Sequence, residues 1–107
     1  MSILSKLSKA LKSKDGDVVY NADKIKNDLQ IHAEYVDNLN PCAIVFKPKD
    51  DISFYGESRG FVFGDSFGRF SDGSYIRTSS IEKRVDIFKN VYIIETRNSC
   101  YLICDMV

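Results

Sequence analysis

The sequence predicts a single α+β domain, in which two N-terminal helices precede an antiparallel sheet of about five strands. Three observations carry this prediction. Apolar residues recur at helical spacing in residues 1–40, whereas in residues 42–107 they alternate or form short runs bounded by turn residues. The length of 107 residues is that of one domain. We therefore expect a helical part, 1–40, and a sheet part, 42–107.

Apolar stripes and terminal signals mark the two helices. The first stripe comprises Ile3, Leu4, Leu7 and Leu11, with lysines between its members. It predicts a helix over 2–13 that Ser2 can cap. A second helix is predicted over 22–38, where Asn21 can cap the start and Pro41 follows the end. A basic amphipathic helix can dock on a partner or a membrane, but the narrow first stripe favours packing on its own domain.

The sheet part begins at Cys42, where the period of apolar residues changes. Short apolar segments predict strands at 43–46, 60–64, 75–78, 91–96 and 100–106. The last two are apolar on both faces, so we expect them to be central strands. The pair Asp72-Gly73 predicts a tight hairpin turn within 70–75, because these residues tolerate a positive φ. Residues 81–89 fit a helix and a strand equally, and both interpretations stay open.

Charge and cysteine content exclude several classes of protein. Lys and Arg number 15, as do Asp and Glu, and 44% of residues are hydrophobic, which excludes disorder and a basic nucleic-acid tail. Cys42, Cys100 and Cys104 form no C-x-x-C pair, and the chain has one histidine, so we expect reduced thiols, no metal site and no cofactor. No apolar run approaches the roughly 20 residues that span a bilayer. No signal-peptide pattern is present, so we expect a cytoplasmic protein.

One short motif resembles that of a known enzyme family. Phe63-Gly64-Asp65-Ser66-Phe67 resembles the first block of the GDSL esterases, which implies Ser66 as a nucleophile. A serine nucleophile needs a base, and the family places its histidine downstream. Here His32 is the only histidine, and it lies upstream on a predicted helix. We therefore interpret the motif as a turn after a strand and expect no enzymatic activity.

A second motif indicates an alternative function. Arg59-Gly60-Phe61-Val62-Phe63 resembles the octapeptide of the RNA-recognition motif, whose aromatic side chains stack on bases. The resemblance implies Phe61 and Phe63 as stacking residues, and Arg77 is the basic residue that would accompany them. Zero net charge weakens the attraction to phosphate. Binding of single-stranded nucleic acid is therefore the alternative function.

Aromatic residues are concentrated between residues 54 and 75, with Arg59 and Arg69 among them and Arg77 just beyond. Exposed aromatics beside arginine are typical of protein-binding hot spots. Small domains also use aromatics to fill their cores, so both interpretations stay open. If the first holds, we expect the contact surface to comprise Phe54, Tyr55, Arg59, Phe67, Arg69 and Phe70.

The C-terminal half resembles a pattern of small uncharacterised phage and prophage proteins. Residues 70–81 read F-S-D-G-S-Y-I-R-T-S-S-I, and T-R-N-S-C-Y-L follows at 96–102. They resemble F-x-D-G-x-x-I-x-T-S-x-I followed by T-x-N-S-x-Y-x-L. A viral origin implies an inhibitor of a bacterial defence system, of the kind that includes anti-CRISPR proteins. We therefore expect a small protein-binding module whose partner is a host protein or a ribonucleoprotein complex such as CRISPR-Cas.

Overall fold

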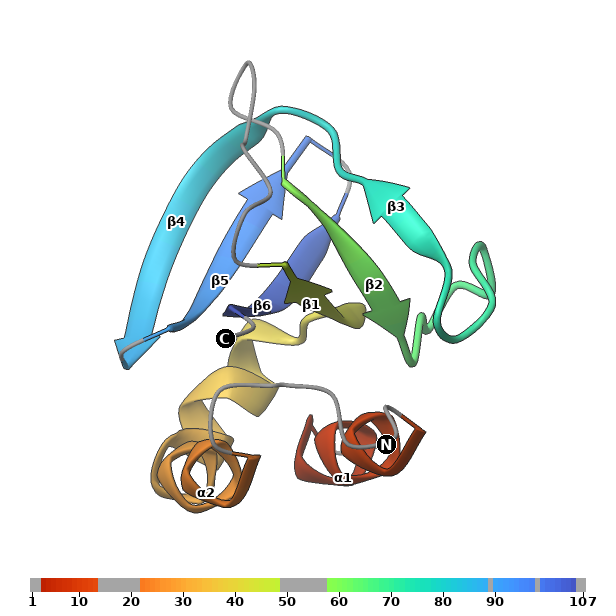
Figure 1. The fold of residues 1–107 in the computed structure, drawn as a ribbon. Coiled ribbons are helices and arrows are strands. Elements are labelled where there is room, and N and C mark those ends of the chain that lie inside the picture. Colours follow the sequence, from red (N-terminus) through yellow and green to blue (C-terminus); the bar gives the residue numbers. More distant parts are fainter. Residues whose placement is uncertain (1–2, 14–21, 49–57, 89, 98, 106–107) are drawn as a thin grey trace.

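The computed structural model describes residues 3–13, 22–48, 58–88, 90–97 and 99–105. The elements are α1 (Ile3–Ser13), α2 (Ala22–Leu39), β1 (Ala43–Lys47), β2 (Arg59–Phe63), β3 (Tyr75–Arg77), β4 (Ile81–Phe88), β5 (Val91–Thr96) and β6 (Cys100–Asp105). This is the predicted α+β class, with two helices before the sheet (Figure 1). The described part of the chain contains six strands where the sequence predicted about five.

The six strands form one sheet in the order β3-β2-β1-β6-β5-β4. β1 and β6 run parallel, with Ala43 beside Tyr101 and Lys47 beside Asp105. The other neighbouring strands are antiparallel. The expectation of a wholly antiparallel sheet is thus corrected at one pair, because the chain crosses to the far edge at β4 and returns through β5 to β6, which lies beside β1. β5 and β6 are central, as their apolar pattern on both faces predicts.

Residues 81–88 form the edge strand β4, which settles the choice between helix and strand. The outward side chains of this strand are charged, a pattern that discourages pairing with another chain. Arg84 lies 3.8 Å from the ring centroid of Tyr92 on the neighbouring strand and pairs with Asp86 at 2.8 Å. The strand is therefore anchored to β5 by side chains as well as by its backbone.

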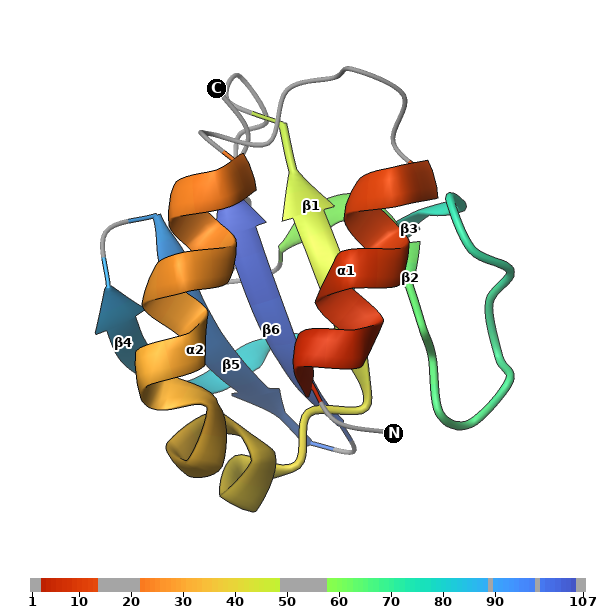
Figure 2. The ribbon, with the colours of Figure 1, turned by 90° about the horizontal axis from the view of Figure 1, so that it is seen from below.

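The two helices lie side by side on one face of the sheet (Figure 2). Their apolar stripes meet the strands in a core that includes Leu7, Ile25, Leu29, Val36, Ile44, Phe46, Phe63, Ile93, Leu102 and Cys104. The first helix therefore packs on its own domain, as its narrow stripe predicts. Neither described helix is long and apolar enough to cross a lipid bilayer.

The opposite face of the sheet curves around a second core (Figure 1). This core comprises Cys42, Ala43, Val45, Val62, Ile76, Tyr92, Ile94, Tyr101 and Ile103. Ile76 comes from the edge strand β3, and Ile81 at the start of the other edge strand packs against the same core. Both sheet edges thus contribute to it, which explains why the central strands are apolar on both faces.

Gly60 lets β2 approach β1 closely. A Cβ atom at this position would lie 2.4 Å from the carbonyl oxygen of Phe46 and 2.7 Å from a methyl carbon of Val45. Any side chain here would force the two strands apart. The glycine therefore fixes the position of β2, and with it the start of the connection 64–74 between β2 and β3.

The turn at Asp72-Gly73 differs from the prediction. Gly73 has the expected positive φ of 88°, and the N–H of Ser74 donates to the carbonyl of Ser71 at 3.1 Å. This turn lies inside the longer connection 64–74 and does not join two strands directly. The predicted tight hairpin within 70–75 is therefore corrected, because the residues before the turn are held to the sheet by side-chain contacts.

Candidate functional site

The buried carboxylate of Asp65 organises the loop that follows β2. This side chain is 1% exposed. Its Oδ1 accepts a hydrogen bond from the N–H of Phe67 at 3.3 Å, and its Oδ2 accepts one from the N–H of Arg69 at 2.8 Å. The N–H of Gly68 also donates to the carbonyl of Asp65 at 3.2 Å. These bonds fold residues 64–70, which we call the contact loop, into a compact turn.

The guanidinium of Arg69 ties the contact loop to the sheet. Its Nε and one terminal nitrogen donate to the two carboxylate oxygens of Asp65, at 3.2 and 3.1 Å. The terminal nitrogens also donate to Ser99 Oγ at 2.9 Å and to Cys42 Sγ at 3.3 Å. Because these partners come from the loop and from the sheet, Arg69 holds the two together.

The Asp65–Arg69 pair is ionised at neutral pH. Burial on its own would raise the pKa of Asp65, but hydrogen bonds from Arg69 and from backbone N–H groups outweigh burial and lower it. The hydrogen bond to Asp65 raises the pKa of Arg69 further above its already high value. The contact loop is therefore held by a charge-assisted pair with two parallel hydrogen bonds.

Arg69 also supports an aromatic cluster. Its guanidinium carbon lies 5.1 Å from the ring centroids of Phe67 and Phe70 and 5.9 Å from that of Tyr101. Phe70 is half-buried against the second core, and Tyr101 is buried in it. Phe67, in contrast, is 65% exposed. The cluster therefore presents one large apolar ring to solvent, held on a fixed cation.

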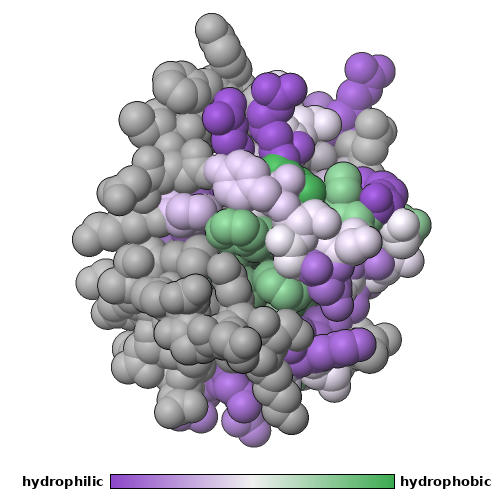
Figure 3. Space-filling view, turned by 45° about the vertical axis from the view of Figure 1, so that its right-hand side comes forward, coloured by the Kyte–Doolittle hydropathy of each residue, from purple (hydrophilic) through white to green (hydrophobic). Residues whose placement is uncertain are grey.

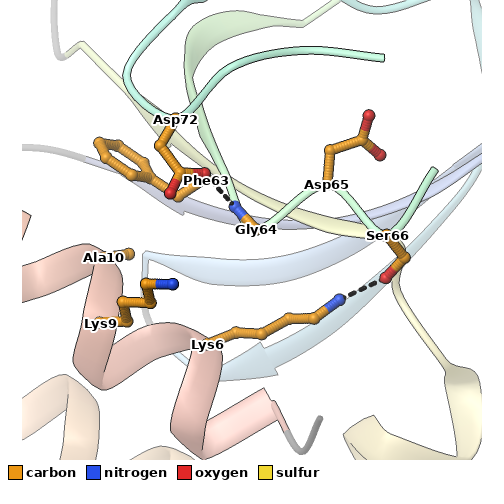
Figure 4. Close-up of a pocket in the computed structure, with 8 residues that line it drawn as sticks. All are labelled: Lys6, Lys9, Ala10, Phe63, Gly64, Asp65, Ser66 and Asp72. Carbon is orange, nitrogen blue, oxygen red and sulfur yellow. Dashed lines mark hydrogen bonds between the residues drawn. The ribbon is translucent and has the colours of Figure 1, made fainter. Parts of the chain in front are cut away.

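A pocket of about 340 Å³ lies on the other side of the contact loop, against α1 (Figure 4). It is lined by Lys6, Lys9, Ala10, Phe63, Gly64, Asp65, Ser66 and Asp72. Lys6 reaches across it, so that its Nζ donates to Ser66 Oγ at 2.6 Å and to the carbonyl of Cys42 at 3.5 Å. The N–H of Gly64 donates to Asp72 Oδ1 at 2.8 Å. The pocket thus joins the helical part to the loop.

Ser66, the nucleophile that the esterase resemblance implies, has a lysine as its neighbour instead of a histidine. His32 lies on α2, where its ring stacks on Phe88 of β4 with centroids 6.1 Å apart. The backbone N–H of Ser66 itself already donates to the carbonyl of Cys42 at 2.7 Å. A lysine can serve as a base only where its surroundings desolvate it, and the Lys6–Ser66 hydrogen bond is solvent-exposed.

Cys100 and Cys104 lie in surroundings that make their thiols poor nucleophiles. Burial, together with the charge of Glu95, raises the pKa of Cys100 to about 11, and burial raises that of Cys104 to about 12. Both remain protonated at neutral pH, and the thiol form is unreactive. Cys42 is buried and contacts Arg69. Within the described ranges, no three His, Cys, Asp or Glu side chains come together in a group that could hold a metal ion.

The structure brings together half of the expected contact residues. Phe67, Arg69 and Phe70 form the cluster described above, with Phe67 at the surface. Arg59 lies apart from them on β2, directly opposite Arg77 on β3. Phe54 and Tyr55 lie outside the described residues.

The rings of the nucleic-acid alternative have different surroundings. Phe63 is 5% exposed, with its ring centroid 5.3 Å from that of Phe46, so it belongs to the core between the helices and the sheet, which we call the helix-side core. Phe61 is half-buried and meets the exposed ring of Tyr75 edge-on at 5.2 Å. Among the residues that are coloured in Figure 3, hydrophobic ones gather near the middle of this face, and hydrophilic ones lie above and below them.

Two residues of the site were missed from sequence. Asp65 stands four positions before Arg69, and this spacing was a usable signal for an ion pair in a turn. Lys6 lies 60 positions before Ser66, so no local pattern relates them. Only the packing of α1 on the sheet brings the two together.

Comparisons with models of protein families, with curated proteins and with solved structures found no match for this chain.

Proposed function

We propose that this protein is a small, non-enzymatic protein-binding module whose contact surface is the contact loop, centred on Phe67. The observation that carries the proposal is that Phe67 is 65% exposed and yet is held on Arg69. Aromatic and arginine side chains dominate binding hot spots. A ring that is already immobilised loses little conformational entropy on binding, so more of its burial energy appears as affinity.

The non-enzymatic part of the proposal is supported by the surroundings of the candidate nucleophiles. Ser66 bonds to Lys6 at an exposed position, and the pKa values of Cys100 and Cys104 are raised. His32 stacks on Phe88 and has no described contact with these groups. The side chains of the contact loop can bind another molecule, and none is activated for bond making.

The class of partner follows from the phage resemblance of the C-terminal half. We propose that the protein inhibits a defence complex in the cytoplasm of a bacterial host, with CRISPR-Cas as the leading case. Expression in a strain with active CRISPR-Cas immunity should then raise the plaque count of a targeted phage. The Phe67→Ala variant should not raise it, and an unchanged plaque count with the wild-type protein would contradict this choice of partner.

Quantitative capture tests the contact surface itself. Immobilised wild-type protein, Phe67→Ala and Ile31→Ala are each exposed to a bacterial lysate, and bound proteins are quantified by mass spectrometry. Ile31 is the matched control because it is 79% exposed and lies on α2. We expect Phe67→Ala to lose about 2 kcal/mol of binding energy and most of the captured partner. Equal capture by all three proteins would overturn the proposal, and circular dichroism verifies that the variants fold.

A second function is favoured by one observation on β2 and β3. The strand register places Arg59 opposite Arg77 and Phe61 opposite Tyr75, so two guanidinium groups and two rings share one sheet face. Such a face can stack bases and contact phosphates. Binding of labelled single-stranded oligonucleotides that weakens with salt would support this alternative, and no binding at low salt would exclude it.

A further inference from the structure

A groove beside Phe67 lies at the end of the sheet where several elements meet. Its volume is about 550 Å³, and the ring of Phe67 forms part of its wall. β4 begins here, β5 ends here and β6 begins here, so the same wall includes Glu82, Lys83, Glu95, Ser99 and Cys100. We call this hollow the Phe67 groove. Because it shares Phe67 with the contact loop, it is continuous with the proposed binding surface.

A β-bulge brings a second glutamate into the groove. Ile81 is opposite Thr96 and Lys83 is opposite Glu95, so Glu82 is an extra residue on β4. An extra residue of this kind interrupts the alternation of side chains along a strand and re-aims one of them. Glu82 therefore lines the groove together with Lys83 and Glu95.

The groove carries more negative than positive charge. Glu82 and Glu95 contribute two carboxylates, and Lys83 can neutralise only one of them. Arg69, which supports the aromatic cluster from behind, is already paired with Asp65. The groove therefore attracts a cation.

The C-terminal end of α2 adds to this negative potential. Asn40, which follows α2 directly, lines the groove, and Cys100 Sγ donates to the carbonyl of Leu39 at 3.8 Å. The last carbonyls of a helix carry partial negative charge, and the last turn of α2 has no basic residue to offset it. The charge of Glu95 also reaches the groove surface, where burial and then this charge raise the pKa of Cys100 to about 11. The exposed Arg97, in the turn between β5 and β6, is not among the lining residues.

The groove wall also has apolar surface, which favours a cation with a hydrocarbon stem. The ring of Phe67 is 65% exposed, and the thiols of Cys42 and Cys100 line the groove with it. An arginine side chain can pack its methylene groups on such a surface while its planar guanidinium stacks on a ring and pairs with a carboxylate. The chain already has this arrangement at the same ring, since Arg69 lies against Phe67 and pairs with Asp65.

A partner segment that covers Phe67 lies at the mouth of this groove. We propose that the protein partner inserts an arginine side chain into the Phe67 groove, where its stem packs on Phe67 and its guanidinium pairs with Glu82 and Glu95. This inference rests on the proposed protein-binding function and adds the chemistry by which the partner is recognised.

The groove is tested with a matched pair of small probes that need no partner. The probes are Nα-acetylarginine methylamide and Nα-acetylcitrulline methylamide, which have nearly the same shape and differ in side-chain charge. Each is titrated into the ¹⁵N-labelled protein at low ionic strength, and the amide signals of Phe67, Ser99 and Cys100 report binding. We expect the arginine probe to bind about fivefold more tightly, since the ion pairs it forms are partly exposed to solvent. Added salt should reduce this preference.

A third probe tests the choice of arginine. Nα-acetyllysine methylamide carries the same charge, but its ammonium cannot stack on a ring or pair with a carboxylate through two hydrogen bonds. It should therefore bind more weakly than the arginine probe. Equal or tighter binding of the lysine probe would overturn the inference, because the groove would then select any organic cation.

Two variants assign the preference to the glutamates. The double variant Glu82→Gln with Glu95→Gln removes both charges with little change in shape, and it should abolish the preference for arginine over citrulline. Glu34→Gln, which changes an exposed glutamate on α2, should leave that preference intact. Equal binding of the arginine and citrulline probes to the wild-type protein would overturn the inference whether or not either variant folds. A preference that persists in the double variant would also overturn it.

The capture experiment separates this inference from the proposed function. If Phe67→Ala loses the partner while the double variant retains it, the contact loop is correct and the arginine anchor is wrong. If the double variant also loses most of the partner while Glu34→Gln does not, the arginine anchor is supported. Failure of Phe67→Ala to affect capture contradicts the proposed surface without reference to the glutamates.

Discussion

The Asp65 carboxylate can be buried because the contact loop surrounds it with donors. Two backbone N–H groups and two nitrogens of Arg69 donate to it. A buried carboxylate without such donors would be strongly destabilising. The exposed ring of Phe67 sits on the same arginine, so the proposed binding surface depends on this one ion pair.

The linkage between the pKa of Asp65 and folding predicts a pH dependence. Since its pKa in the folded protein lies below the ordinary value of 3.8, the ionised carboxylate stabilises the fold above that pH. This contribution is lost as the pH falls through the lowered pKa. At neutral pH we expect Asp65→Asn to lower the free energy of unfolding by about 2 kcal/mol, less than for a fully buried pair because Arg69 is one-third exposed.

Urea denaturation at neutral pH and at a pH well below 3.8 measures this difference. The gap between wild type and Asp65→Asn should shrink in acid. Asp86→Asn is the control, since both partners of the exposed Arg84–Asp86 pair face solvent and the change should cost little. A gap that is the same at both pH values would show that the charge of Asp65 does not stabilise the loop.

α1 links the core to the pocket beside Lys6. Leu7 is fully buried in the helix-side core, and the preceding residue, Lys6, reaches Ser66. Adjacent positions of one helix therefore serve the fold and the pocket. The position of the ammonium group depends on how well this helix packs.

Truncation of Leu7 tests that packing. Leu7→Ala removes a fully buried side chain, and we expect it to lower the free energy of unfolding by about 3 kcal/mol. Ser8→Ala, at a partly exposed neighbouring position, should change it by less than about 0.5 kcal/mol. Urea denaturation followed by circular dichroism gives both values. A loss below about 1 kcal/mol for Leu7→Ala would indicate that α1 is only loosely attached.

The elements show which parts of the fold a sequence can predict. The helix predicted over 22–38 is observed as Ala22–Leu39, because helical periodicity and the stop signal at Pro41 are both local features of the sequence. The parallel pairing of β1 with β6 was not predictable, since the apolar pattern of a strand does not specify its partner. For the same reason the strand state of 81–88 became clear only from its pairing with β5.

The candidate site was predictable in its residues but not in their roles. The aromatic–arginine pattern identified Phe67, Arg69 and Phe70, and the structure places them together. The sequence pattern predicted Arg69 as a residue that contacts a partner. In the structure its guanidinium instead donates to Ser99 and Asp65 of the same chain. The pocket beside Lys6 depends on a contact across 60 positions of sequence, beyond any local pattern.

At the scale of the whole molecule, a small chain buries two cores by covering one sheet face with helices and curving the other face on itself. Cys104 belongs to the helix-side core, and Cys42 to the second. The thiols therefore report on the integrity of both cores. Their chemistry also bears on the proposal that the protein does not act as an enzyme.

Alkylation measures that chemistry directly. At neutral pH, iodoacetamide should leave Cys104 unmodified in the folded protein, because the thiol is buried and its pKa is raised to about 12. The same reagent should modify all three cysteines after denaturation in guanidinium chloride. Mass spectrometry of intact and digested protein distinguishes the sites. Rapid modification of Cys104 or Cys100 in the folded protein would reveal an activated thiol. It would contradict the proposal that the protein binds a partner and catalyses no reaction.

Amide hydrogen exchange of the protein, alone and with the captured partner, tests the central claim most directly. The claim is that the protein acts by binding another protein through the contact loop at residues 64–70. We predict that the partner slows exchange in this loop and in the facing part of α1. Exchange around Ile31 on α2, which is 79% exposed, should remain unchanged. Protection confined to α2, or absent from the contact loop, would contradict the claim.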